Sequence, residues 1–170
     1  MTSSETGGAF VSSRLNIRIA QKEDAALVFS FIKKIADYEK MSDQVVATVE
    51  TLEEFVFDRG AAQVFLAEYD GQAVGFALFF ENFSTFIGRT GLYLEDLFVD
   101  PDKRGLGIGK ALFQAVAAEA ERRGCQRMEW TCLDWNTPSI EFYRRMGAIS
   151  MDEWTTYRLA GKAVGEAVQK

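Results

Sequence analysis

The sequence predicts one α/β domain in which helices alternate with the strands of a mixed sheet. Two observations lead to this prediction. The chain has 170 residues, of which 48% are hydrophobic and 13% aromatic, a composition typical of a globular domain with a sizeable core. Along the chain, segments with the two-residue alternation of strands are interleaved with segments in which apolar residues recur at helical spacing. No internal repeat and no domain boundary is visible.

The N-terminal part is expected to contain a tail, a strand and two helices. Met1–Ser13 is rich in Ser, Thr and Gly, so we expect a flexible tail followed by one domain over residues 14–170. Leu15–Ile19 alternates apolar and polar side chains as an edge strand does. Asp24 can cap an amphipathic helix. The segment Thr51–Glu54 resembles a capping box at the start of a shorter helix.

A hairpin and a central strand are expected next. Gln63–Tyr69 and Gln72–Phe80 have strand character, and Asp70-Gly71 between them is a strong signal for a tight turn. Glu81–Arg89 is interpreted as a polar and aromatic loop. Leu92–Val99 is apolar on both alternating faces, which favours a strand covered on both sides.

The C-terminal part is expected to hold two helices and two strands. The longer helix follows a glycine-rich loop and ends at Gly124, a residue type typical of helix C-termini. Arg127–Cys132 has the pattern of a strand. Thr137 is expected to cap a helix that ends at Gly147. Trp154–Leu159 is expected to close the sheet.

The glycine-rich loop is Arg104–Lys110, with the sequence RGLGIGK. Glycine at every second position lets successive N–H groups point into one concavity, and the following helix N-terminus adds partial positive charge. A Walker loop needs Lys-Ser or Lys-Thr at its end, and a dinucleotide fingerprint needs a glycine at position 110. Neither requirement is met. The segment therefore predicts an anion site, and we expect the anion to be a diphosphate.

The central strand contains two adjacent carboxylates, Glu95 and Asp96. An ionised carboxylate inside a sheet is costly unless it is paired or functional. Simple alternation places Asp96 on the face opposite Glu95, unless a bulge intervenes.

Composition excludes several classes of site. The chain has no histidine, which removes histidine-based zinc sites, Ser-His-Asp triads and Cys-His dyads, and we expect no metal. Its two cysteines, Cys125 and Cys132, are expected to be small core residues in a reducing compartment. The net charge of −6 argues weakly against nucleic acid. No apolar segment is long enough for a membrane span, so we expect a cytoplasmic protein.

The pattern R-G-x-G-[IV]-G after a strand with carboxylates resembles the acetyl-CoA motif of the GNAT superfamily of N-acetyltransferases. Within it, Asp37–Met41, Tyr93–Asp96 and Leu133–Tyr143 resemble the diamine (spermidine/spermine) acetyltransferases and the similar thialysine acetyltransferases. This resemblance covers about Leu15–Ala160. It implies a GNAT-like fold with a mostly antiparallel central sheet flanked by helices, acetyl-CoA as co-substrate, and a homodimer.

Acetyl transfer to an amine needs a base for the ammonium and an acid for the departing thiolate. Glu95 is the candidate base, because it lies four residues before Val99. That is roughly 13 Å, comparable to the reach of an extended pantetheine arm, and the resemblance gives this glutamate the same role. Tyr143 is the candidate acid, since a phenol can protonate a thiolate. The alternatives are a salt-bridged carboxylate for Glu95 and a core aromatic for Tyr143.

The resemblance also implies which residues hold each substrate. Around the cofactor these are the backbone of Leu97, Phe98 and Val99, the loop residues Arg104, Gly105, Leu106, Gly107, Ile108, Gly109 and Lys110, and Asn136, Ser139 and Tyr143. Around the amine they are Tyr38, Glu39, Glu95, Asp96, Glu129, Trp130 and Thr131. The N–H of Leu97 is expected to stabilise the oxyanion. Asp96 either orients the substrate or bonds to the surrounding structure.

The expected acceptor is a small primary amine, a polyamine or a lysine-like amine. Ser84 and Phe86 stand where polyamine acetyltransferases tend to carry an acidic residue and a tryptophan, which favours the thialysine-type branch and a shorter amine. Asp152 and Glu153 either add negative potential around the acceptor or are solvated surface carboxylates. Two other functions stay open: acetylation of a protein N-terminus or lysine, and non-catalytic binding of an acyl-CoA.

Overall fold

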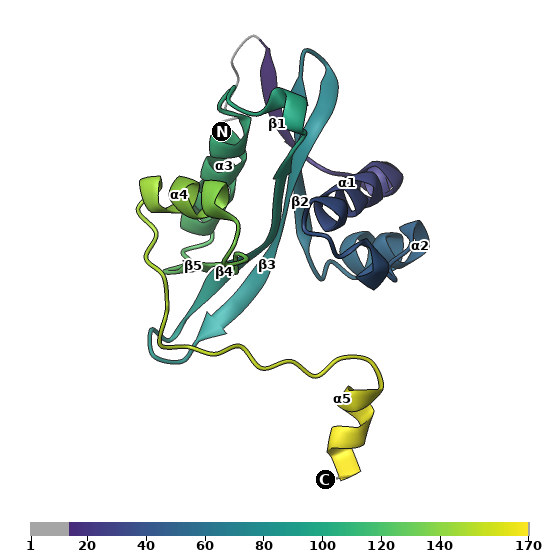
Figure 1. The fold of residues 1–170 in the computed structure, drawn as a ribbon, viewed down its shortest axis with the longest axis vertical. Coiled ribbons are helices and arrows are strands. Elements are labelled where there is room, and N and C mark those ends of the chain that lie inside the picture. The colour runs from purple at the N-terminus through teal and green to yellow at the C-terminus, as the bar shows by residue number, and fades with distance from the viewer. Residues whose placement is uncertain (1–13, 170) are drawn as a thin grey trace, which may run out of the picture. The chain divides into compact units, whose positions relative to one another are not determined.

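The computed structural model describes residues 14–169 (Figure 1). The tail expected over residues 1–13 lies outside these described residues. The chain divides into two compact units at residues 131 and 132. The first unit contains the sheet with the helices that cover it, and the second contains two helices joined by an irregular segment.

The sheet has five strands in the order β1-β2-β3-β4-β5. All neighbouring strands are antiparallel except β4 and β5, which are parallel. The mixed, mostly antiparallel sheet that the sequence predicts is therefore confirmed. The strands are β1 (Leu15–Ile19), β2 (Gln63–Tyr69), β3 (Gln72–Ser84), β4 (Arg89–Val99) and β5 (Met128–Glu129).

Helices cover both faces of the sheet, with α1 and α2 on one side and α3 on the other (Figure 1). None of the helices within residues 14–169 combines the length and the apolar character needed to cross a bilayer. The α-helices are α1 (Ala25–Tyr38), α2 (Val49–Leu52), α3 (Ile108–Arg122), α4 (Thr137–Arg145) and α5 (Lys162–Glu166). The 3₁₀ turns are η1 (Lys22–Asp24), η2 (Ser42–Gln44), η4 (Pro101–Lys103) and η5 (Ala167–Gln169), and η3 (Glu53–Asp58) is a π-helical segment that directly follows α2.

The hairpin between β2 and β3 forms at the predicted turn, where Asp70 has φ 51° and Gly71 has φ 77°. The loop expected over Glu81–Arg89 is much shorter, because β3 continues to Ser84 and only residues 85–88 form the turn. Polar side chains in this extension have partners on other elements. The carboxylate of Glu81, for example, lies 2.9 Å from Nη1 of Arg123. Such pairing lets a polar segment continue the ladder.

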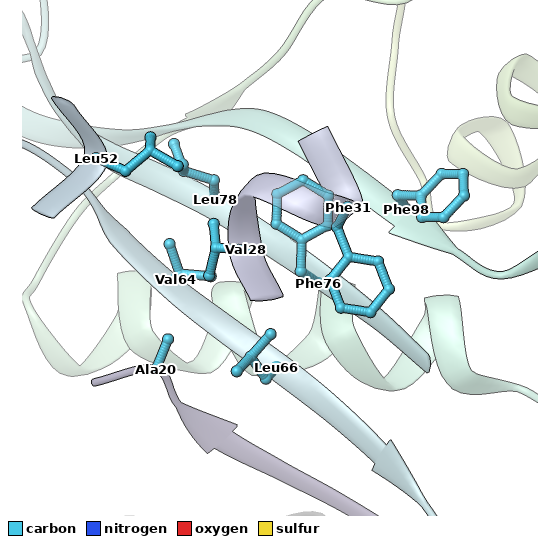
Figure 2. Packing of buried hydrophobic residues seen from close by; sticks show 9 residues of the cluster. All are labelled: Ala20, Val28, Phe31, Leu52, Val64, Leu66, Phe76, Leu78 and Phe98. Atoms are coloured by element: carbon cyan, nitrogen blue, oxygen red, sulfur yellow. The ribbon is translucent and has the colours of Figure 1, made fainter. Parts of the chain in front are cut away.

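The core between the sheet and α1 is rich in phenylalanine (Figure 2). Phe31 of α1 stacks on Phe76 of β3, with ring centroids 5.6 Å apart, and also contacts Phe98 of β4. This packing is what the helical spacing of apolar residues in α1 predicts. It holds the middle of α1 against β3 and the C-terminal end of β4.

Both short-helix caps differ from the predicted ones. Thr48, rather than Thr51, caps α2, because the two threonine hydroxyls exchange hydrogen bonds with each other's backbone N–H groups. Asn136, rather than Thr137, caps α4 by accepting from the N–H of Ser139 at 3.4 Å. The predicted glycine after α4 is confirmed, since Gly147 has φ 89°.

Two of the strand predictions are wrong. One strand is shorter than expected, and the other is absent. Arg127–Cys132 is reduced to the two residues of β5. Trp154–Leu159 has no strand structure, and within residues 14–169 no strand pairs with it. A turn at residues 152–153 precedes the segment, and the N–H of Trp154 closes it by bonding to the carbonyl of Met151 at 3.1 Å. An extended segment without a neighbouring strand has no ladder to join.

The phenylalanine core provides a stability test. Phe31→Ala should lower the free energy of unfolding by about 3–5 kcal/mol, because it removes a buried ring and leaves a cavity. Phe86→Ala is the matched control, since Phe86 is 96% exposed and its loss should change stability little. Urea unfolding followed by circular dichroism measures both. A similar small effect for the two variants would contradict the stacked core.

Candidate active site

A β-bulge at Glu95 shapes the centre of β4. Asp96 pairs with Leu78 and Leu94 pairs with Phe79, so Glu95 has no partner residue in β3. The bulge that the sequence left open is therefore present. Leu78 belongs to the core cluster beneath α1. Its cross-strand partner Asp96 consequently faces α1, because directly opposed residues share a face of the sheet.

Three carboxylates meet at this point. Burial, followed by the negative charges of Glu95 and Glu39, raises the pKa of Asp96 to about 7. Glu39 follows the last residue of α1, and burial raises the pKa of its own carboxyl group. The structure thus brings together three of the residues predicted for the acceptor. A carboxyl group with a pKa near neutrality can exchange a proton at physiological pH, and the cluster attracts a cation.

Arg104 lies beside this cluster. Its guanidinium carbon is 4.8 Å from the ring centroid of Tyr38 and 5.8 Å from that of Phe98. Its Nε donates to the carbonyl oxygen of Val99 at 3.1 Å. The first residue of the glycine-rich loop and a predicted acceptor residue are therefore in contact.

A second link joins the same two segments. Nζ of Lys34 donates to Oδ1 of Asp100 at 2.7 Å, one helical turn before Tyr38. No motif in the sequence points to this pair. The four-residue spacing between Lys34 and Tyr38 places them on one face of α1, but sequence alone does not show which segment that face meets.

The loop has the backbone form expected of an anion site. Gly105 and Gly107 both have φ 80°, in the left-handed region that strains residues with a side chain. Gly107 precedes the first residue of α3. The first-turn amides of a helix lack acceptors within the helix, so those of α3 are available to an anion. These residues fit a diphosphate, with Arg104 and Lys110 supplying positive charge.

One edge of β4 is open beside the loop. β5 pairs only with Leu92 and Tyr93, and within residues 14–131 no strand pairs with that edge from Leu94 to Val99. An extended chain bearing amide groups can add to such an edge as a strand would. The residues predicted to face pantetheine, Leu97 to Val99, lie on this edge.

The residues of β5 and its continuation that are predicted to bind the amine point to different faces of the sheet. Glu129 pairs with Tyr93, and its carboxylate lies 2.9 Å from Nε of Arg127. Trp130 instead packs edge-to-face against Phe113 of α3, with ring centroids 5.3 Å apart. Adjacent residues of an extended segment point to opposite faces, so these two side chains do not share one pocket. Thr131 is exposed.

The remaining predicted residues lie in the second unit, on α4 and at its cap. The side chain of Asn136 is buried and caps the helix. Ser139 follows in the first turn. The ring of Tyr143 contacts that of Phe142, with centroids 5.2 Å apart. Asp152 and Glu153 are exposed and lie beyond α4.

Comparison with known proteins gives consistent matches. The model of the acetyltransferase (GNAT) family matches residues 31–148. The thialysine N-epsilon-acetyltransferase of Sus scrofa is 34% identical over 166 residues, which cover 91% of this chain and 97% of that protein. The L-ornithine N5-acetyltransferase of Arabidopsis thaliana is 43% identical over 101 residues, covering 59% of this chain and 44% of that protein.

A solved structure also matches over most of the chain. The integron cassette protein from the mobile metagenome of V. cholerae has a TM-score of 0.76 and 28% identity, and the match covers 92% of this chain and 99% of that one. The family match spans the core of the sheet, the bulged strand and the glycine-rich loop. The chain therefore belongs to the GNAT family and is a GNAT-family N-acetyltransferase.

Proposed function

We propose that this enzyme transfers the acetyl group of acetyl-CoA to the terminal primary amine of a small basic molecule. The observation that carries the proposal is the cluster of Glu39, Glu95 and Asp96 at the open edge of β4. A cluster of carboxylates beside an anion-binding loop suits two substrates of opposite charge. The loop takes the phosphates and the cluster takes an ammonium group.

The cofactor site uses backbone as well as charge. The amides of Gly105 to Lys110 and the side chain of Arg104 hold the pyrophosphate, and the edge of β4 at Leu97 to Val99 pairs with the pantetheine amides. When bound, acetyl-CoA supplies an activated thioester. The resemblance to the family also implies a role in cofactor binding for Asn136, which caps α4, and for Ser139 in its first turn. The N–H of Leu97 stabilises the negative charge that develops on the thioester oxygen.

The acceptor must lose a proton before it can attack. An alkylammonium has a pKa of about 10.4, so it binds as a cation and is attracted by Asp96 and Glu39. Glu95 accepts the proton, directly or through a water molecule. The free amine then forms the new bond to the acetyl carbon while the carbon–sulfur bond breaks. Tyr143 gives its phenolic proton to the departing thiolate.

The relatives favour an amino-acid-like acceptor. Their names specify acetylation at the N-epsilon of thialysine and at N5 of L-ornithine, and each is a terminal amine on a short chain. Ser84 is buried, and Phe86 at the tip of the β3–β4 hairpin is almost fully exposed. Neither residue offers a charge for the distant amine of a long polyamine. We therefore favour a lysine- or ornithine-like acceptor.

A panel of amines tests the proposal. Thialysine, lysine, ornithine, putrescine, spermidine and a lysine-containing peptide are each assayed for release of CoA from acetyl-CoA. The expected result is turnover with the basic amino acids well above that with the peptide. Turnover with the peptide alone would overturn the small-amine proposal, and absence of CoA binding in calorimetry would overturn the cofactor assignment.

The acid–base roles predict a specific pattern of losses. Glu95→Gln and Tyr143→Phe should each lower kcat by about 10²–10⁴-fold and leave the Kd for CoA nearly unchanged, because each removes one proton transfer. Glu121→Gln on the exposed side of α3 and Tyr69→Phe on β2 are matched controls with the same chemical change. Steady-state kinetics and calorimetry measure the two quantities. Wild-type turnover in either variant would remove that residue from the mechanism.

The acidic cluster predicts a pH dependence. Below pH 7 Asp96 is largely protonated, so kcat/KM should rise as pH increases through about 7 and the carboxylate forms. Asp96→Asn should abolish this rise. Glu39→Gln removes a negative neighbour, lowers the pKa of Asp96 and should move the rise to lower pH. Asp43→Asn, an exposed carboxylate in η2, is the control, and an unchanged profile for Asp96→Asn would contradict the assignment.

The proposed assembly is a homodimer. The C-terminal segment beyond α4 exposes large apolar side chains, and a partner subunit would cover them. These are Ile149, Met151, Trp154, Tyr157 and Leu159. Size-exclusion chromatography with light scattering at micromolar concentration should give twice the chain mass of 19.0 kDa, and a monomer would contradict the dimer.

A further inference from the structure

We propose that Lys34 is a positioning residue that couples the acceptor-binding end of α1 to the phosphate-binding loop. This inference rests on the proposed function. Lys34 itself touches neither the carboxylate cluster nor the glycine residues of the loop. It acts through Asp100, whose Oδ1 accepts from its Nζ at 2.7 Å. The same ammonium lies 4.9 Å from the ring centroid of Phe31, a buried residue of the core.

The ion pair is the first of two contacts along the same two segments, and a longer-range electrostatic interaction follows them. One turn after Lys34, the ring of Tyr38 lies under the guanidinium of Arg104. The next residue, Glu39, raises the pKa of Asp96 through its charge. The end of α1 therefore runs beside β4 and the start of the loop. Tyr38 and Glu39, which are predicted to bind the amine, lie at this end.

The segment between Asp100 and Arg104 is short and internally bonded. The N–H of Lys103 bonds to the carbonyl of Asp100 at 2.9 Å, and that of Arg104 bonds to the carbonyl of Pro101 at 3.3 Å. Asp100 is also tied to β3, because its N–H donates to the carbonyl of Val74 at 2.8 Å. A displacement of α1 at Lys34 is thus carried to Arg104 through one helical turn.

The pair is better suited to positioning than to holding the fold together. The side chain of Lys34 is 47% exposed and that of Asp100 is 18% exposed, and ion pairs at such sites add little to stability. A displacement of α1, in contrast, moves Tyr38 and Glu39, the residues proposed to bind the amine, and so weakens amine binding. Arg104 contacts Tyr38 on one side and is expected to bind phosphate on the other. Binding at the loop therefore alters the environment of Tyr38. Lys34 fixes the position of α1 relative to the segment from Asp100 to Arg104.

The test compares two neighbouring lysines. Lys34→Met removes the ion pair and keeps the length of the side chain. Lys33→Met makes the same charge change at the preceding residue, whose ammonium lies 4.9 Å from the ring centroid of Phe29. Calorimetry measures the Kd for CoA without amine and with saturating amine acceptor, which gives a coupling factor between the sites. Thermal unfolding of each variant is measured alongside.

The expected coupling factor is five-fold or more in the wild type and in Lys33→Met, and less than two-fold in Lys34→Met. Asp100→Asn should lose the coupling as Lys34→Met does, and the double variant should lose no more. Lys34→Arg should retain it, since arginine can still donate to Asp100. In kinetics, Lys34→Met should raise the KM for the amine about three- to ten-fold and change kcat less than two-fold, with a Tm close to that of the wild type.

Equal coupling factors in Lys34→Met and Lys33→Met would overturn the inference, as would a wild type whose affinity for CoA does not respond to the amine. Loss of coupling in both lysine variants would indicate a general effect of charge and would also overturn it. These outcomes differ from failure of the proposed function, in which the wild type binds no CoA or acetylates none of the amines.

Discussion

One unpaired residue in β4 determines the geometry on which the candidate site depends. Because Glu95 has no partner in β3, the pattern of alternation shifts by one position within the strand. Leu94 and Asp96 consequently face opposite sides of the sheet, and the residue between them is left exposed. Bulges of this kind re-aim side chains next to functional sites. Here the bulge directs one carboxylate towards the end of α1 and leaves the other accessible.

The carboxylate cluster is unfavourable in the absence of a cation. Burial raises the pKa of Asp96, and the negative charges of Glu95 and Glu39 add to the shift, which shows the cost of an ionised carboxylate where water is partly excluded. In a chain without histidine, such a shifted carboxyl group takes the place of the usual group that titrates near neutrality. The local cost is offset by the phenylalanine core that holds α1 against β4, so binding chemistry and packing depend on the same two elements.

Much of the fold follows from local signals in the sequence. The β2–β3 turn could be predicted because Asp-Gly supports left-handed backbone, and α1 because its apolar residues recur at helical spacing. The errors concern interactions between distant residues. The extension of β3 to Ser84 depends on partners such as Arg123, and the segment Trp154–Leu159 has strand-like composition but no strand beside it.

The candidate site, like the fold, has features that local sequence signals predict and features that depend on contacts between distant residues. Glu95 and Asp96 could be identified because carboxylates in an apolar strand are unusual, and Glu39 through the resemblance to the acetyltransferase family. The position of the bulge could not be predicted, because it depends on which residues of β3 pair with β4. The expected strand also ended at Phe80, whereas β3 continues to Ser84. The contacts of Arg104 with Tyr38 and of Lys34 with Asp100 join segments more than sixty residues apart. No periodicity within either segment specifies such a pairing.

The open edge of β4 has a consequence for handling the protein. A strand edge with unpaired N–H and C=O groups is a template for self-association and aggregation. A ligand that lies along Leu94 to Val99 covers these groups and also stabilises the folded state by mass action. Preparations that retain such a ligand are therefore the better starting material for concentration and crystallisation, and exhaustive dialysis favours precipitation.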